Sequence, residues 1–303
     1  MTRFTADQLK TFATVVEYGT FDAAADVLMI SASAVSQRIK AMEQSAGRVL
    51  IKRTNPVAPT DSGEVVLRVA RQSEYLHTEL SRELDGDESA QTVSIAVNSD
   101  SLSTWLLDAV RVLAREDHIY CDLRREGEYH SSALLRSGEV MAAVTSEPDP
   151  IAGCAVDKLG IGSYWPVAST EFARDFFPDL PASLTATQLA QAPVIEYDHK
   201  DFGQQRGRQL IASKYRLGKN LQDAPSVYVP SSPDYVRAVD MGIGWGIVPE
   251  TQSADALAEG RWVKLADEPV EIPLFWQHWK ITSSVMERVT QRIYDALGEG
   301  YVY

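Results

Sequence analysis

Small and polar side chains share one face of a helix that we predict to begin at Ser31. If Val35, Ile39 and Met42 point toward a core, the opposite face carries these residues: Ala32, Ser33, Ser36, Gln37 and Lys40. Small side chains let a helix enter a groove, serine and glutamine hydrogen-bond to base edges and phosphates, and lysine supplies a point charge. This face is suited to double-stranded DNA, although an ordinary amphipathic helix with a solvated face has the same spacing.

Cations extend this DNA-binding prediction beyond the polar face. Arg38 lies on the same helix, and Lys52 and Arg53 follow a short predicted strand that leads into the turn-rich segment TNPVAPT. A hairpin after three helices forms a wing, whose cations can meet a phosphate or the minor groove, whereas a solvated turn is the alternative. Residues 1–64 carry seven Lys or Arg and seven Asp or Glu, so the net charge of −13 arises downstream. An acidic body suits cationic small ligands and leaves DNA contact to the local basic cluster.

Polar side chains also gather where predicted strands end in the region after residue 91. The first set follows a strand at the start of a helix and comprises Asn98, Ser99, Asp100 and Ser101. A second set follows the third strand and comprises Thr145, Ser146 and Glu147, and a third belongs to a later lobe and comprises Tyr197, Asp198, Ser231 and Ser232. Hydroxyls and helix-start amides bind anions, and carboxylates bind cations. We therefore predict a small-molecule site, with a non-binding helix cap at residues 98–101 and a solvated acid at Glu147 as the alternatives.

Motifs of catalysis and metal binding do not occur in the sequence. The five histidines show no metal-ligand spacing, and there is no GxSxG, P-loop or GxGxxG. His130 adjoins Ser131 and Ser132, but neighbouring residues on a helix rarely face each other, so a capping role is preferred. Cys121 and Cys154 have no ligand spacing and are expected to be buried thiols rather than a redox pair. We expect a protein that is not an enzyme and needs neither metal nor cofactor.

Three helices and a long fourth one must position the DNA-reading face. Thr5 and Gln8 form a capping-box pattern, the first helix ends near Gly19, and Thr20 can start the second. The second helix, a short turn and the helix from Ser31 make a helix-turn-helix within residues 1–60. Residues 61–85 read as one long helix whose apolar stripe is broad enough to pair with a second copy, and 85–91 as a polar hinge.

Strands and helices alternate from residue 92 to the end, and predict an effector-binding domain of two α/β lobes with a cleft between them. Lobe I would contain about 92–163 and 268–303, and lobe II about 164–267. We expect strands at 93–97, 120–124, 141–145, 164–169, 192–197, 226–230, 244–249, 262–266 and 272–280. The sequence contains neither a membrane-spanning apolar run nor an apolar signal segment, so we expect a cytoplasmic protein with no membrane partner. A periplasmic amino-acid receptor would share the lobes but would have no use for residues 1–60.

The N-terminal motifs resemble the winged helix of LysR-type transcriptional regulators. That family has Ser-x-Ser-Ala-Val-Ser, then Ile-x-x-Leu-Glu, Gly-x-x-Leu-hydrophobic-x-Arg and Thr-x-x-Gly. The matching residues here are Ser31, Ser33, Ala34, Val35, Ser36, Ile39, Met42, Glu43, Gly47, Leu50, Ile51, Arg53, Thr60 and Gly63. The lobes have the length and order that the family requires. The wing departs from the common form, because TNPVAPT replaces a glycine-rich basic turn.

Four further stretches are similar to the branch of this family that senses lysine or arginine and controls export of basic amino acids. They are 96–110, 143–156, 229–250 and 273–280. The resemblance implies an activator that works on operator DNA as a dimer or as a tetramer made of two dimers, with RNA polymerase as a partner and the effector between the lobes. We assign Ser99 and Ser101 to the effector carboxylate, and Asp100 or Glu147 to its ammonium or guanidinium group. The alternative is a LysR-type regulator of another pathway with a different small effector.

Overall fold

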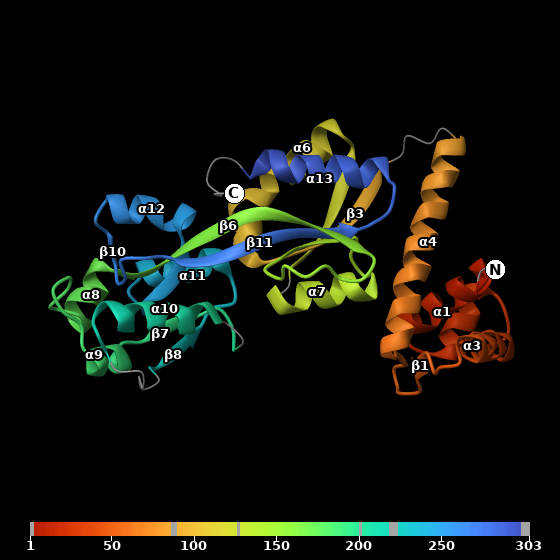
Figure 1. Ribbon diagram of the computed structural model, residues 1–303, viewed down its shortest axis with the longest axis horizontal. Helices are drawn as coiled ribbons and strands as arrows, with labels where there is room; N and C mark the ends of the chain where they lie inside the picture. The colour runs from red at the N-terminus through yellow and green to blue at the C-terminus, as the bar shows by residue number, and fades with distance from the viewer. Residues whose placement is uncertain (1–2, 86–89, 126–127, 200–201, 218–223, 298–303) are drawn as a thin grey trace.

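The computed structural model describes residues 3–85, 90–125, 128–199, 202–217 and 224–297 (Figure 1). Its N-terminal unit contains α1 (Ala6–Tyr18), α2 (Phe21–Leu28), α3 (Ala32–Ala46), β1 (Ile51–Lys52) and β2 (Ala58–Pro59). The predicted caps are confirmed, since Thr5 forms a capping box with Gln8, and Thr20 and Ser31 accept hydrogen bonds from the first turns of α2 and α3. The sequence prediction of a helix-turn-helix followed by a short hairpin is therefore confirmed.

A compact apolar core fixes the recognition helix α3 against its neighbours. Val35, Ile39 and Met42 are at most 3% exposed and pack with Phe12 of α1, as the helical spacing predicted. The carboxylate of Glu43 accepts hydrogen bonds from the backbone N–H groups of Leu50, at 2.9 Å, and Ile51, at 3.4 Å. These bonds hold the wing on α3, because charge-assisted hydrogen bonds of this kind are stronger than neutral ones.

The long helix α4 (Asp61–Asp85) has the predicted bounds and begins against the wing. Gly63 lies so close to the backbone just before β1 that a Cβ atom there would overlap the carbonyl oxygen of Leu50. This close approach explains the glycine of the Thr60-x-x-Gly63 pattern, since every other side chain would push α4 away from the wing. One face of α4 leaves apolar side chains 40–77% exposed, namely Val65, Val69, Leu76, Leu80 and Leu84. The predicted hinge at 85–91 falls mostly on 86–89, which lie outside the described residues.

The rest of the chain is built on one continuous sheet with strand order β10-β6-β11-β5-β3-β4, and β9 pairs with β6 beside this path. Three strands are parallel: β3 (Gln91–Val97), β4 (Ile119–Arg125) and β5 (Ala142–Thr145). β6 (Cys154–Ser169) and β11 (Val270–Trp279) run antiparallel along their length, from Tyr164 opposite Val270 to Cys154 opposite Trp279. β9 (Gly246–Pro249) and β10 (Trp262–Lys264) complete the sheet, while β7 (Val194–Glu196) and β8 (Ser226–Tyr228) form a separate parallel pair.

Helices cover the sheet in two lobes, each with its own core (Figure 1). Lobe I carries α5 (Ser99–Ser101), a π-helical turn (Leu102–Leu106), α6 (Leu107–Glu116), α7 (Glu128–Ser137) and α13 (Ser284–Ala296). Lobe II carries α8 (Thr170–Phe176), α9 (Ala186–Gln191), α10 (Phe202–Lys214), α11 (Ser232–Asp240) and α12 (Glu250–Ala258). Trp276 is fully buried in the first core and Trp245 in the second.

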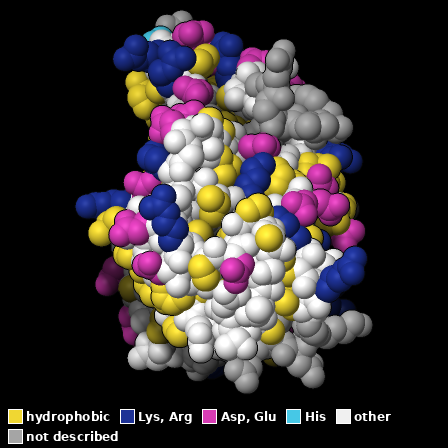
Figure 2. Space-filling view, turned by 90° about the vertical axis from the view of Figure 1, so that its left-hand side faces the viewer, with side chains coloured by type: hydrophobic (Ala, Val, Ile, Leu, Met, Phe, Trp, Pro, Cys, Tyr) yellow, Lys and Arg dark blue, Asp and Glu magenta, His cyan; other side chains and the backbone are white. Residues whose placement is uncertain are grey.

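Two features of this domain differ from the sequence prediction. The strand predicted at 164–169 begins ten residues earlier, at Cys154, because β6 pairs with β11 through both lobes. Helix α12 was not predicted, although its Ser253 and Ala256 are buried. At the outer end of lobe II, Lys and Arg side chains are interspersed with Asp and Glu (Figure 2). No helix in the described ranges combines the length and apolar character needed to cross a membrane.

The two cysteines are free thiols, and burial raises the pKa of both Cys121 and Cys154 to about 11 from an ordinary value of 9.0. A raised pKa keeps the thiol protonated, and the thiolate is the nucleophile. At pH 8 we expect both to react with a thiol reagent about 100-fold more slowly in the folded protein than in urea. Similar rates in the two states would show that the thiols are accessible and ionised.

Candidate functional site

The polar residues after β3 are buried where the helix of lobe I begins. Asn98 is 5% exposed and Ser101 is 1% exposed, and neither Asn98 Oδ1 nor Ser101 Oγ has a hydrogen-bond partner in the described part of the chain. Asn98 is the N-cap residue of α5, but its side chain makes no capping hydrogen bond. The helix continues through a π-helical turn, a distortion that is frequent at functional sites. Two buried side-chain oxygens without partners among the described residues, beside the first turn of a helix, indicate a place for a polar ligand.

The second predicted set lies beside the first, because β3 and β5 are paired neighbours and their ends meet at one edge of the sheet. Thr145 is 1% exposed, and its hydroxyl accepts a hydrogen bond from the backbone N–H of Glu147 at 3.3 Å. Ser146 and Glu147 are half-buried, which does not match a fully solvated loop acid.

Gln277 of β11 holds this loop and was missed by the sequence prediction. Its side chain is fully buried, accepts from Ile151 N–H at 3.0 Å, and donates to the carbonyl oxygens of Glu147 at 3.0 Å and Asp149 at 3.1 Å. A single amide side chain thus fixes three points of the loop that presents Glu147. Its sequence signal was an amide in the otherwise apolar and aromatic strand PLFWQHW.

One contact joins the third predicted set directly to the first. The backbone N–H of Ser232, at the start of α11 in lobe II, donates to Ser99 Oγ of lobe I at 3.2 Å, and both residues are buried. Ser232 Oγ in turn bonds Gln252 of α12 at 3.2 Å. Ser231, Tyr197 and Asp198 are half-buried at the ends of β7 and β8, which are paired strands. Ser99 and Ser232 therefore lie where the two lobes meet.

The DNA-reading face of α3 is open to solvent. Ser31, Ser33, Ser36, Gln37 and Lys40 are exposed, as are Lys52 and Arg53 on the wing, while Ala32 is half-buried. Ser31 and Ser33 are tied to each other by a hydrogen bond of 2.9 Å between their hydroxyls. Arg38 differs from these residues, because its guanidinium donates to Thr11 of α1 at 3.0 Å and is half-buried. Its role in this arrangement is to hold α3 on α1.

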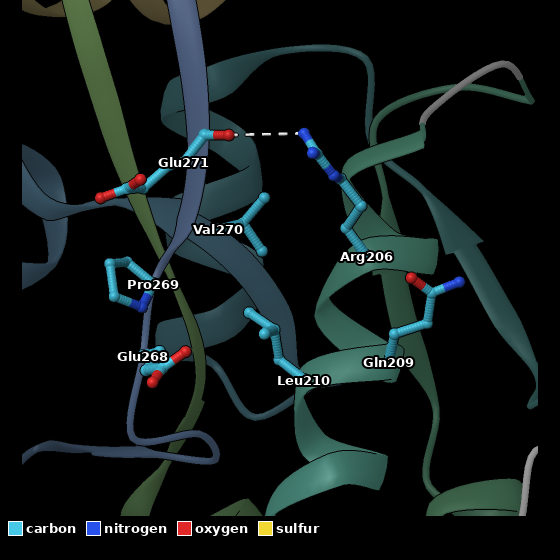
Figure 3. A pocket seen from close by; sticks show the side chains of 7 residues that line it. All are labelled: Arg206, Gln209, Leu210, Glu268, Pro269, Val270 and Glu271. Carbon is cyan, nitrogen blue, oxygen red and sulfur yellow. Dashed lines mark hydrogen bonds between the residues drawn. The ribbon is translucent and has the colours of Figure 1, made fainter.

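A separate hollow of about 500 Å³ lies between α10 and the segment that leads into β11 (Figure 3). None of the predicted effector residues lines it, and Arg206 spans it with a 3.4 Å bond to the carbonyl oxygen of Glu271. Its lining residues are Arg206, Gln209, Leu210, Glu268, Pro269, Val270 and Glu271. Its charged lining residues are one arginine and two glutamates, and it is separate from the predicted strand-end residues.

Both the N-terminal and the C-terminal part of the chain match known protein families. Residues 6–64 match the family described as bacterial regulatory helix-turn-helix protein, lysR family, and residues 86–298 match the LysR substrate binding domain. The lysine export transcriptional regulatory protein LysG of Corynebacterium efficiens is 38% identical over 292 residues, covering 96% of this chain and 97% of that protein.

Two solved structures share the fold. The crystal structure of ArgP from Mycobacterium tuberculosis has a TM-score of 0.87 and 37% identity, covering 97% of this chain and 98% of that one. Full-length LysG from Corynebacterium glutamicum with bound effector Arg also has a TM-score of 0.87, with 34% identity, covering 99% of this chain and all of that one. The expected winged helix and two-lobed α/β domain are confirmed. The chain belongs to the LysR family of bacterial regulatory helix-turn-helix proteins.

Proposed function

We propose that this protein is a transcriptional regulator whose activity is set by arginine or lysine bound between the two lobes. The observation that carries the proposal is the pair of buried, unpartnered oxygens at Asn98 and Ser101, beside the bond that joins Ser99 to Ser232. A solved relative with bound effector Arg supports the ligand class. A second relative, named as a lysine export regulator, supports control of a basic amino acid exporter gene. Residues 1–60 would bind DNA and residues 92–303 would bind the effector. Residues 61–91 would link these two domains and pair two subunits.

Each charged group of the ligand has a complementary group in the protein. The α-carboxylate would accept hydrogen bonds from Ser101 Oγ and from helix-start amides, and its α-ammonium would donate to Asn98 Oδ1. Asp100 or Glu147 would pair with the distal cation, and a guanidinium can bind a carboxylate through two parallel bonds. Because Ser99 and Ser232 belong to different lobes, a ligand beside them would change how the lobes contact each other.

DNA binding would use the exposed face of α3 and the wing cations of two subunits. The exposed apolar face of α4 supports pairing with a second copy, since burying such side chains contributes about 25 cal/mol per Å². A dimer places two recognition helices on two half-sites, and a tetramer made of two dimers would span a longer operator. Contact with RNA polymerase belongs to the same proposal, as the route by which an activator acts.

A thermal-shift screen of the full chain against the twenty amino acids tests the effector. A ligand that binds only the folded state at about 100 times its Kd stabilises it by about 2.7 kcal/mol, which corresponds to roughly 5–10 °C in Tm. We expect such a shift with arginine or lysine and none with acidic or aromatic amino acids. A shift confined to an acidic amino acid would contradict the assigned roles of Asp100 and Glu147, and no shift with any would remove the effector class.

A further inference from the structure

Consecutive residues of α4 contact two different parts of the protein. Leu67 is 1% exposed and belongs to the core of the DNA-binding unit, whereas the next residue, Arg68, is 6% exposed and packs on lobe I. Figure 1 shows α4 running alongside both parts. Any shift of lobe I against Arg68 therefore acts on a helix turn that is also part of the DNA-binding core.

The backbone of lobe I is shaped around the Arg68 side chain. Gly138 and Gly153 have φ values of +77° and +82°, and a Cβ atom would lie 3.0 Å from Arg68 Cα at the first and 3.3 Å from Arg68 Nε at the second. The guanidinium points to the carbonyl end of α7, with NH1 3.5 Å from the carbonyl oxygen of Arg136. A helix C-terminus carries partial negative charge and so stabilises a buried cation.

Gly153 ends the loop that begins at the candidate effector site. Residues 146–153 start with Ser146 and Glu147, and buried Gln277 holds the loop by three hydrogen bonds. Gly153 itself is tied to the residue that follows β11, because its carbonyl oxygen accepts from Lys280 N–H at 3.0 Å. These bonds join the loop from Glu147 to Gly153 to β11 and the residue after it, so the contacts form one continuous connection between the candidate site and Arg68.

We propose that Arg68 is a positioning residue that transmits occupancy of the effector site to α4 through Gly153. The inference rests on the proposed function, because it assumes that a ligand engages the loop at Glu147. Further along α4, Tyr75 bonds Ser283 at 3.0 Å and Glu79 accepts from Ser283 at 2.8 Å, which keeps the helix on lobe I. Arg68 reaches the loop of residues 146–153 at Gly153, and arginine binding orders this contact.

Hydrogen–deuterium exchange of the full chain with and without arginine tests the proposal, with calorimetry to measure arginine affinity. In the natural protein we expect arginine to slow amide exchange at least about threefold both in 142–153 and in 64–72 of α4. In the Arg68→Met variant, which keeps the packing stem, we expect slowing in 142–153 only, with arginine affinity within about threefold of the natural value.

Arg71→Met is the matched control, since Arg71 also lies on α4 and donates to the carbonyl oxygen of Ser137 at 3.0 Å. We expect this variant to keep the response of α4. The proposal is overturned if α4 does not respond in the natural protein, if it still responds in Arg68→Met, or if Arg71→Met loses the response equally.

If calorimetry detects binding of neither arginine nor lysine, the proposed function is overturned, and this coupling with it, whereas arginine binding without a response of α4 overturns the coupling alone. Should Arg68→Met fail to fold, Arg68→Lys keeps the charge and the stem but lacks the terminal guanidinium nitrogens, one of which bonds the carbonyl oxygen of Arg136, and the same loss of response is expected.

Discussion

The Ser36→Ala, Gln37→Ala double variant is expected to bind operator DNA about 100-fold more weakly than the natural protein. Both side chains are exposed on α3, opposite the buried residues Val35 and Ile39, so their removal deletes groove contacts without disturbing the core. Each good side-chain contact to a base edge contributes about 1–3 kcal/mol of discrimination. Electrophoretic mobility shifts at fixed salt measure the change.

Gln44→Ala provides the matched control for this variant. Gln44 is exposed on the last turn of the same helix, beyond the predicted DNA-binding face, and its removal should leave operator affinity within about threefold. Equal affinity of the double variant and the natural protein would exclude this face of α3 from recognition. The thermal midpoint of both variants should remain unchanged, because none of the three side chains is buried.

The Ser101→Ala variant is expected to bind arginine at least about 10-fold more weakly while unfolding no more easily than the natural protein. The hydroxyl of Ser101 is buried and has no partner among the described residues, so without ligand its removal costs no hydrogen bond within the protein. Stability should remain equal or rise by up to about 1 kcal/mol. In the complex the hydroxyl would bond a charged carboxylate, a contact worth about 1.5–3 kcal/mol.

Ser253→Ala is expected to show the opposite behaviour and serves as the control. Ser253 is fully buried on α12, but its hydroxyl donates to the carbonyl oxygen of Glu250. Its removal should lower stability by about 1 kcal/mol and leave arginine affinity unchanged. Calorimetric titration and urea unfolding measure both variants. Unaltered arginine affinity in Ser101→Ala would show that Ser101 lies outside the site.

Local patterns in the sequence were sufficient to predict the DNA-binding unit. Caps and helical spacing act over three or four residues, so Thr5, Thr20 and Ser31 could be identified without knowledge of the fold. The same local signals located Asn98 to Ser101 at a strand end. They could not show that the Asn98 oxygen has no partner, because this depends on how distant segments pack around it.

Residues that act over long sequence distances were beyond such patterns. Gln277 bonds the loop 126–130 residues earlier in the chain, and Arg68 meets a carbonyl oxygen 68 residues later. Arg38 could not be separated from its exposed neighbours, since its hydrogen bond to Thr11 depends on the angle between α1 and α3. The extent of β6 was underestimated because its first half pairs with β11, a strand more than a hundred residues away.

The position of β11 in the sheet has a consequence for synthesis of the chain. β11 lies between β6 and β5, yet it leaves the ribosome only after all of lobe II. Until then both neighbouring strands have open edges, which are prone to pair with other chains. The core of the DNA-binding unit, by contrast, draws on no residue beyond Ala70. A growing chain can therefore complete the core of its DNA-binding unit long before Gln277 and Ser283 are made, and we expect a chain cut short in lobe II to fold this unit without a complete second domain.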